Sequence, residues 1–245
     1  MSEKILQLKN ITKSYNETTV LENISFDVAK GQVVVLLGPS GCGKSTLLRC
    51  MNGLEQIQGG AILLNDDNII SEKTNWSDVR QKIGMVFQSY DLFPHMSVID
   101  NILLGPTKAQ KRNKDEVKKE AEILLKRVGL LDKINAFPRE LSGGQKQRVA
   151  IVRALIMKPE VMLFDEITAS LDPEMVREVL DVVLELASSG MTMIIVTHEM
   201  MFARKIADRV VFIDAGKIVE IARPDTFFEN PKSDRASQFL NIFQY

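Results

Sequence analysis

The chain has 245 residues, a formal net charge of -1, and 45% hydrophobic and 26% charged residues. This length fits one globular domain with subdomains or two small domains, and the near-neutral charge argues against a nucleic-acid partner. The longest apolar runs, such as residues 33–37 and 191–196, are far shorter than the roughly 20 residues that span a bilayer. The first ten residues lack the features of a signal peptide, so we expect a cytoplasmic protein that does not itself cross a membrane.

The first third of the chain alternates short apolar runs with polar stretches. Ile5–Leu8, Ile24–Val28 and Ala61–Leu64 predict an antiparallel β region. Val33–Leu37 is a continuous apolar run that leads into a glycine-rich loop, and a helical pattern begins near Lys44. This stretch therefore predicts a strand, a loop and a helix in succession.

Three later apolar runs also end in polar residues. Ile83–Phe87 leads into Gln88, Val161–Phe164 into Asp165 and Glu166, and Met193–Val196 into Thr197 and His198. Ligands bind beyond the carboxyl ends of the strands in parallel α/β sheets, so we expect one site assembled from these distant segments.

The stretch from 91 to 157 is predicted to be a helical insertion. Its apolar residues recur at helical spacing, as in Val117, Ala121, Leu124, Leu125 and Val128. Residues 214–217 separate two strand-like runs and predict a hairpin. We expect a single α/β domain over residues 1–245. Its core, residues 1–90 and 158–245, combines a mainly parallel sheet with an N-terminal antiparallel β subdomain, and residues 91–157 form an α-helical subdomain.

Residues 38–45 match the phosphate-loop motif G-x-x-x-x-G-K-[ST] in the strand–loop–helix context that it requires. The glycines let backbone N–H groups face phosphate oxygens, Lys44 reaches the β- and γ-phosphates, and Ser45 ligates Mg²⁺. We therefore predict a P-loop NTPase core that binds a nucleoside triphosphate and Mg²⁺; a glycine-rich turn without a ligand is the alternative. The predicted nucleotide-binding residues are Gly38, Pro39, Ser40, Gly41, Cys42, Gly43, Lys44, Ser45 and Thr46.

Two further segments fit a nucleotide site. Asp165 suits a Mg²⁺ ligand and Glu166 suits the base for the attacking water, although acidic residues at a strand end are commonly solvated or helix-capping. Residues 141–145 read Leu-Ser-Gly-Gly-Gln and precede a helical pattern, which places Ser142 near a helix N-terminus that can face an anion. A simple helix cap is the other interpretation of Ser142.

In this order and spacing, the motifs resemble those of the nucleotide-binding subunits of ABC transporters. The residues that carry the resemblance are 38–45, Gln88, 141–145, 161–166, 170–172 and His198. The family implies a head-to-tail homodimer, in which each ATP lies between the phosphate loop of one subunit and Ser142, Gly143, Gly144 and Gln145 of the other. It also implies separate transmembrane permease subunits, indirectly an extracytoplasmic solute-binding protein, and a peripheral location on the cytoplasmic face of the membrane.

The resemblance also implies roles for single residues. Tyr15 would stack on adenine, and Gln88 would link Mg²⁺ to the membrane-subunit contact. Asp172 would line the dimer interface, and His198 would touch the γ-phosphate beside Glu166 and Lys44, the other catalytic residues. Tyr15 as a half-buried strand aromatic, and Gln88 and His198 as ordinary polar strand ends, are the alternatives.

One departure from the family pattern is Ile167, which stands where the family usually has proline. The change frees a backbone N–H and relaxes φ but removes no catalytic group, so hydrolysis is still expected.

Other stretches, including residues 51–55, 93–98 and 227–231, resemble the polar amino acid uptake group. The predicted function is therefore the ATP-hydrolysing subunit of a polar amino acid importer. Its alternatives are an importer ATPase for another small solute, a non-transport ABC ATPase and an ATP-binding module that does not hydrolyse.

Overall fold

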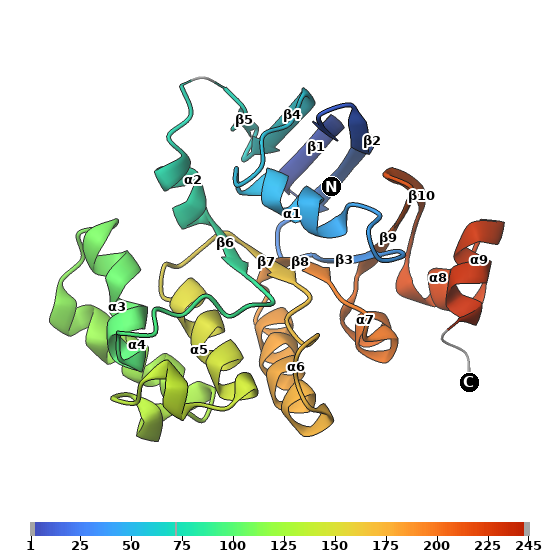
Figure 1. The fold of residues 1–245 in the computed structure, drawn as a ribbon. Helices are drawn as coiled ribbons and strands as arrows, with labels where there is room; N and C mark the ends of the chain where they lie inside the picture. Colours follow the sequence, from blue (N-terminus) through green and yellow to red (C-terminus); the bar gives the residue numbers. More distant parts are fainter. Residues whose placement is uncertain (1–2, 72, 243–245) are drawn as a thin grey trace.

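The structure is a computed structural model that describes residues 3–71 and 73–242. The ends of the expected domain, residues 1–2 and 243–245, lie outside the described residues, as does residue 72. Its elements form two sheets with helices between and around them (Figure 1).

The smaller sheet is antiparallel and has the strand order β2-β1-β4-β5. It consists of β1 (Lys4–Tyr15), β2 (Thr18–Ala29), β4 (Gly59–Leu64) and the short β5 (Asp67–Asn68). The predicted antiparallel β region is confirmed, but β1 and β2 are much longer than the apolar runs that indicated them. Register shifts interrupt their pairing beyond Leu8, so the inward side chains there lose the strict alternation by which a strand is recognised in a sequence.

The larger sheet has the strand order β10-β9-β3-β8-β7-β6. Its strands are β3 (Val33–Leu37), β6 (Ile83–Val86), β7 (Val161–Asp165), β8 (Thr192–Val196), β9 (Arg209–Asp214) and β10 (Lys217–Ala222). All its strand pairs are parallel except β9 with β10, which form the predicted hairpin. The mainly parallel sheet is therefore confirmed.

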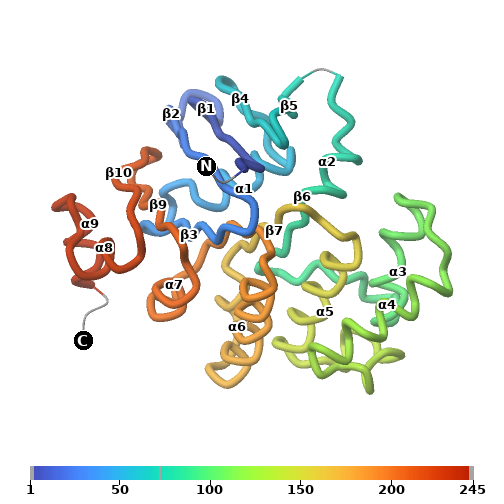
Figure 2. Tube along the Cα trace, turned by 180° about the vertical axis from the view of Figure 1, so that it is seen from behind, coloured from blue at the N-terminus to red at the C-terminus, as the bar shows by residue number. Residues whose placement is uncertain are grey.

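The central strands are buried on both faces, which explains their continuous apolar runs. On β3, Val34 and Leu36 join the core cluster that also contains residues of the antiparallel sheet and of α1 (Lys44–Met51). The alternate residues, such as Val35, join a second cluster with α6 (Pro173–Ser188) and α7 (Met200–Ile206). Figures 1 and 2 show the same layering, with α1 between the sheets and α6 and α7 on the far side of the larger sheet.

Three helices at one end of the molecule build a third core cluster. They are α3 (Val98–Lys108), α4 (Lys114–Arg127) and α5 (Gly143–Leu155), and the 3₁₀ turns η1 (Leu131–Lys133) and η2 (Pro138–Glu140) connect α4 to α5. Side chains of Ser97, Asn113 and Ser142 cap the three helix N-termini. The remaining helices are α2 (Trp76–Lys82) before β6, and α8 (Pro224–Glu229) and α9 (Asp234–Asn241) after β10.

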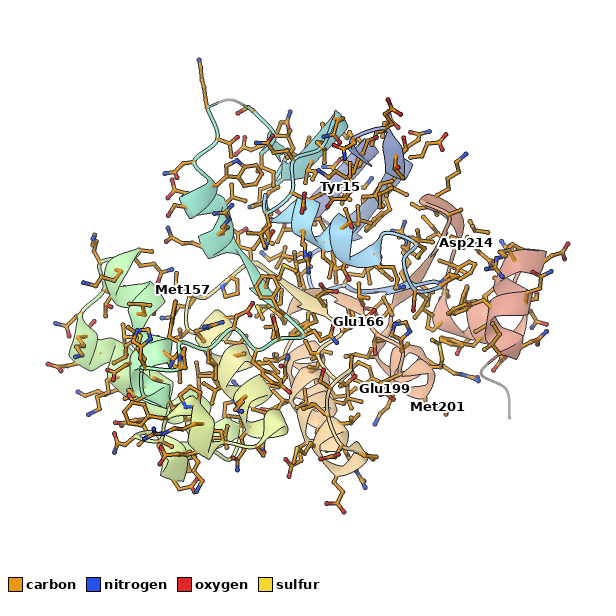
Figure 3. All side chains as sticks on the ribbon, in the orientation of Figure 1. Tyr15, Met157, Glu166, Glu199, Met201 and Asp214 are labelled. Carbon is orange, nitrogen blue, oxygen red and sulfur yellow. The ribbon has the colours of Figure 1, made fainter. Side chains whose placement is uncertain are left out.

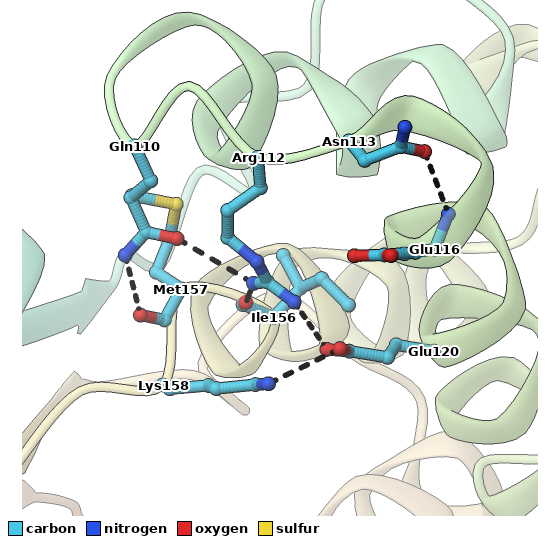
Figure 4. Close-up of polar contacts among 8 residues, drawn as sticks. All are labelled: Gln110, Arg112, Asn113, Glu116, Glu120, Ile156, Met157 and Lys158. Atoms are coloured by element: carbon cyan, nitrogen blue, oxygen red, sulfur yellow. Dashed lines mark hydrogen bonds and ion pairs between the residues drawn. The ribbon is translucent and has the colours of Figure 1, made fainter.

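A polar cluster, here named the helical anchor, fastens the turn after α5 to the loop between α3 and α4 (Figure 4). It comprises Gln110, Arg112, Glu120, Ile156, Met157 and Lys158. Arg112 donates hydrogen bonds to the Ile156 carbonyl at 2.9 Å and to Glu120 at 2.6 Å. Lys158 also binds Glu120, at 3.1 Å, and Gln110 donates to the Met157 carbonyl at 2.8 Å. These bonds fix the end of α5, whose chain continues into β7.

None of the helices within residues 3–71 and 73–242 combines the length and the apolar character that a membrane span needs.

Candidate nucleotide-binding site

The phosphate loop connects β3 to α1 and passes close to other backbone. At Gly38, φ is +153°, and a Cβ atom there would lie 2.0 Å from the carbonyl oxygen of Ile213, so only glycine fits. Helix α1 begins after Gly43, which has a left-handed conformation and provides no side-chain cap. The first turn also contains no acidic residue. Its N–H groups are therefore available to an anion.

Lys44 is a buried charge whose direct partners are neutral groups. It is 4% exposed, and its ammonium group donates hydrogen bonds to the carbonyl oxygens of Gly38 and Pro39, both at 2.8 Å. Among the described residues it forms no ion pair. A buried ammonium without a counter-charge is costly, and a phosphate group beside it would relieve that cost.

Ser45 and Asp165 meet across the loop, although they lie far apart in the sequence. The Ser45 hydroxyl donates a hydrogen bond of 2.6 Å to the Asp165 carboxylate, which is 5% exposed. Burial raises the pKa of Asp165, and the Ser45 hydrogen bond opposes this shift only in part. A cation beside the two oxygens would favour the ionised carboxylate.

These donors fit Mg²⁺. Ser45, Asp165 and Gln88 line one cleft of about 650 Å³, and all three offer oxygen atoms. Within the described parts of the chain, no group of three or more His, Cys, Asp or Glu side chains could hold a metal by itself. Mg²⁺ commonly binds through one or two carboxylates, waters and substrate phosphates, so few protein ligands are expected at such a site.

Glu166 and His198 come together at the ends of neighbouring strands β7 and β8. The His198 Nε2 atom lies 2.8 Å from Glu166 Oε1. Glu166 has φ of +47°, which is strained for a non-glycine residue, and its N–H donates to the Val196 carbonyl at 3.0 Å. Figure 3 shows Glu166 near the ends of the central strands. With this backbone conformation, the partly exposed Glu166 carboxylate lies next to His198.

The segment 141–145 forms the start of α5. The Ser142 hydroxyl accepts a hydrogen bond from the Gln145 N–H at 3.3 Å, and the Gln145 side chain accepts one from the Ser142 N–H at 3.0 Å, a reciprocal capping box. A Cβ atom at Gly143 would lie 2.9 Å from the Leu171 side chain. No hydrogen bond in the described ranges joins this segment to the phosphate loop. One chain therefore does not bring the two segments together.

Two residues that the sequence analysis missed hold the loop after β6. Gln147 is fully buried and donates a hydrogen bond of 3.2 Å to the carbonyl of Phe87, which precedes Gln88. Arg153 donates to the carbonyls of Asp91 at 2.5 Å and Tyr90 at 3.2 Å. Arg153 could have been found as the one charged residue in the apolar run 149–156, whereas Gln147 lies in the polar stretch 145–148 and has no such signal. Together they attach the Gln88 loop to α5.

The other expected residues lie at the edges of this arrangement. Tyr15 ends β1, is 42% exposed, and its hydroxyl lies near the Thr46 side chain beside the phosphate loop. Gln88 and Asp172 are exposed, and Asp172 makes no side-chain cap to α6. Ile167 is 5% exposed and packs in the second core cluster, so the residue in place of proline serves the core.

A strand, a glycine loop and a helix that carries a buried lysine, beside a strand ending in two carboxylates, define a P-loop ATPase. Comparison with known proteins gives the family. A family model described as "ABC transporter" matches residues 21–169, more than half of the chain. The chain belongs to the ABC transporter family. It is an ATP-binding, ATP-hydrolysing subunit of that family.

The relatives cover almost the whole chain. The arginine transport ATP-binding protein ArtM of Bacillus subtilis (strain 168) is 54% identical over 96% of this chain and 98% of its own length. The glutamine transport ATP-binding protein GlnQ of Bacillus subtilis (strain 168) is 53% identical over 97% and 98%. The glutamate/aspartate import ATP-binding protein GltL of Escherichia coli (strain K12) is 54% identical over 96% and 98%.

Two solved structures share the fold. CbiO1 from Clostridium perfringens, described as part of the ABC transporter complex CbiONQ, superposes with a TM-score of 0.84 at 31% identity, covering 98% of this chain and 96% of its own. A dimeric ATP-binding cassette in a post-hydrolysis state, bound to ADP and Pi, has a TM-score of 0.81 at 30% identity, covering 90% and 99%. The predicted family, fold class and ATPase activity are confirmed. The roles of the single site residues stay predictions.

Proposed function

We propose that this chain powers the uptake of polar amino acids through separate transmembrane permease subunits. Relatives at 53–54% identity are named for the transport of arginine, glutamine and glutamate/aspartate. The similarity covers nearly the full length of this chain and of each relative, and the relatives are named for four different amino acids. It therefore supports a class of cargo, and the permease and an extracytoplasmic solute-binding protein would select the compound.

ATP as the energy source is supported by five residues that gather at the carboxyl ends of β3, β7 and β8, namely Lys44, Ser45, Asp165, Glu166 and His198. In this arrangement the α1 N-terminus and Lys44 would bind the phosphates of ATP. Mg²⁺ would be held by Ser45, Asp165 and Gln88, and when bound it would neutralise the charge that develops on the phosphate oxygens.

Glu166 is the base that would accept a proton from the attacking water. His198, 2.8 Å from its carboxylate, would hold the side chain in place and reach toward the γ-phosphate. The strained backbone of Glu166 and its contact with His198 keep both side chains at the carboxyl ends of β7 and β8 before any substrate arrives. Positioning of this kind reduces the reorganisation that the reaction requires.

Two copies of the chain would complete the site. Among the described residues, the segment 141–145 has no hydrogen bond to the phosphate loop of its own chain, and Ser142, Gly143 and Gln145 are partly exposed to solvent. In a head-to-tail homodimer this segment would close over ATP bound to the partner's phosphate loop, and the exposed Asp172 would lie at the interface. A solved relative of this fold is itself a dimer bound to ADP and Pi.

Coupling to the membrane would pass through the Gln88 loop. Gln147 and Arg153 attach this loop to α5. If Gln88 shifts when phosphate and metal bind, α5 would therefore shift with it. The permease would contact residues 88–97, and the chain would sit on the cytoplasmic face of the membrane as a peripheral subunit. ATP binding would close the dimer, and hydrolysis would reset it.

Uptake of labelled amino acids tests this function. Cells from which this chain has been deleted should lose uptake of one or more of arginine, glutamine, glutamate and aspartate. Wild-type chain should restore that uptake, whereas Glu166→Gln, which keeps the binding residues, should not. Unchanged uptake of all four after deletion would contradict the proposed cargo, and restoration by Glu166→Gln would contradict the role of hydrolysis.

A further inference from the structure

A buried lysine beside the phosphate loop has no role in the mechanism described above. Lys13 lies on β1, is only 5% exposed, and forms an ion pair of 3.2 Å with Glu55, a residue of the loop after α1. Lysine is almost never buried to this degree without a partner. Glu55 satisfies its charge, but it does not explain why a charge is kept at this position.

The second contact of Lys13 is with Tyr15, two residues further along the same strand. The Lys13 ammonium lies over the Tyr15 ring, 4.3 Å from its centroid. Residues i and i+2 of a strand share one face, so the extended backbone of β1 places the two side chains together. A cation at this distance is attracted by the electrons of the ring face.

The Tyr15 hydroxyl is held as well. It lies near the side chains of Glu55 and Thr46, and burial, followed by the interaction with Glu55, raises the pKa of the phenol, which therefore stays neutral. Glu55 is itself fixed, because its N–H and that of Leu54 both donate to the Arg49 carbonyl at the end of α1. The ring thus has the Lys13 ammonium over one face and polar side chains near its hydroxyl, while 42% of the residue is exposed to solvent.

We propose that Lys13 and Glu55 are positioning residues that hold the Tyr15 ring ready to stack on the adenine base of ATP. This inference rests on the proposed function, which places ATP at the phosphate loop. A ring already fixed on the protein side loses little rotational freedom when a base binds, so the support strengthens binding by lowering its entropic cost. The ammonium also draws electrons from the ring, which favours stacking against an electron-rich purine.

A merely structural ion pair would behave differently. It would stabilise β1 against the loop after α1, and its loss would lower the free energy of unfolding without distinguishing one bound phosphate compound from another. If Lys13 and Glu55 position the Tyr15 ring, their loss should weaken only the binding of ligands that contain the base. Inorganic tripolyphosphate has the three phosphates of ATP but no base, so comparing the two ligands separates the two roles.

The test uses Lys13→Met, which removes the charge and keeps much of the length of the side chain. Binding of ATP and of tripolyphosphate to the purified full chain is measured by calorimetry without added Mg²⁺, so that turnover does not consume ATP. We expect ATP affinity to fall about two- to tenfold, while tripolyphosphate affinity is unchanged. Lys13→Arg, which keeps the cation, should restore ATP affinity. Lys9→Met, a change of an exposed lysine on the same strand, is the matched control and should bind both ligands as wild type does.

Combining the change with Tyr15→Ala completes the test. If Lys13 acts through the ring, Lys13→Met should have no further effect on ATP affinity in the Tyr15→Ala background. An equal loss for ATP and tripolyphosphate, a loss that persists without the ring, or no loss at all would overturn the inference. Failure of the proposed function is distinct, because Lys44→Ala would then leave the affinity for both ligands unchanged. If Lys13→Met does not fold, Glu55→Gln provides the same comparison with an expected smaller loss.

Discussion

Two regions of the molecule combine basic and acidic side chains. One is the helical anchor. The other, here named the phosphate edge, comprises Lys44, Ser45, Asp165, Glu166 and His198. In the helical anchor, Arg112 and Lys158 both meet the carboxylate of Glu120, and the remaining donors meet backbone carbonyls. In the phosphate edge, the hydrogen-bond partners of Lys44 among the described residues are two carbonyl oxygens and the Cys42 sulfur, and that of the buried Asp165 carboxylate is the Ser45 hydroxyl.

This contrast separates a ligand site from a structural cluster. A charge that meets an opposite charge within its own chain is stabilised without a ligand, whereas a buried charge held by neutral groups is ready for an external ion of opposite sign. Substitutions in the phosphate edge should therefore change turnover and nucleotide binding. Substitutions in the helical anchor should change stability and leave the chemistry of the isolated subunit intact.

The largest effect is expected for Glu166→Gln. The change removes the base and keeps the size of the side chain, so the turnover number should fall about 10²- to 10⁴-fold while ATP still binds. Phosphate release and equilibrium ATP binding are measured on the same preparation. Glu160→Gln, a change of the residue just before β7, is the control and should retain wild-type turnover. Equal phosphate release by Glu166→Gln and wild type would refute the assigned role.

Lys44→Ala should weaken the binding of ATP. Loss of a charged donor to phosphate costs about 1.5–3 kcal/mol, which corresponds to a Kd for ATP raised roughly 10- to 150-fold. Calorimetry with ATP measures this change, and Lys30→Ala, on an exposed lysine before β3, is the control. An unaltered Kd for Lys44→Ala would show that the lysine does not contact the nucleotide.

Arg112→Met should lower the free energy of unfolding by about 1–3 kcal/mol, because the Ile156 carbonyl and Glu120 lose their shared donor. Urea unfolding measures this change, and Lys158→Met, at the exposed side of the same cluster, should cost at most about 1 kcal/mol. ATP turnover of the folded variant should match that of wild type. A loss of turnover without a loss of stability would remove the distinction between the two clusters.

The smallest effect concerns the pH dependence of the helical anchor. The Arg112 hydrogen bond, followed by other contacts, lowers the pKa of Glu120. A carboxylate with a lowered folded-state pKa stabilises the fold above its ordinary pKa, and this contribution disappears as the pH falls through the folded-state value. Glu120→Gln should therefore be less stable than wild type near about pH 7, by at most about 1 kcal/mol because the pair is partly exposed. This difference in the free energy of unfolding between Glu120→Gln and wild type should disappear in strong acid.

Urea unfolding at both pH values tests this expectation. Glu122→Gln, on the same helix, is the control, because Glu122 forms no ion pair with the described residues. A gap for Glu120→Gln that persists unchanged in acid would show that the carboxylate charge does not stabilise the cluster.

Much of this organisation is predictable from the sequence. The run Val33–Leu37, the glycine loop and the helix start at Lys44 follow from local patterns, and the structure places them as expected. The pairing of β7 with β8 brings Glu166 to His198, as the polar strand ends indicated. Local patterns suffice here because buried parallel strands and phosphate loops impose strict demands on residue type.

Other features depend on contacts between distant segments and could not be predicted. The bond from Gln147 to Phe87 and the ion pair from Lys13 to Glu55 join residues far apart in the sequence, and each residue alone is an unremarkable polar side chain. The full lengths of β1 and β2 also depend on their mutual pairing, because register shifts break the alternation that marks a strand. Tertiary pairing decides these features, and single-sequence patterns do not contain it.

A mixing experiment tests whether each ATP site is shared between two chains, as the proposed head-to-tail homodimer requires. One variant lacks the phosphate contact, Lys44→Ala; the other, Ser142→Asp, keeps a residue able to cap α5 but places a negative charge toward phosphate. In a mixed dimer, the intact loop of one chain faces the intact segment 141–145 of the other. We predict that two inactive preparations regain phosphate release when mixed. Activity no greater than the sum of the separate variants would contradict a shared site.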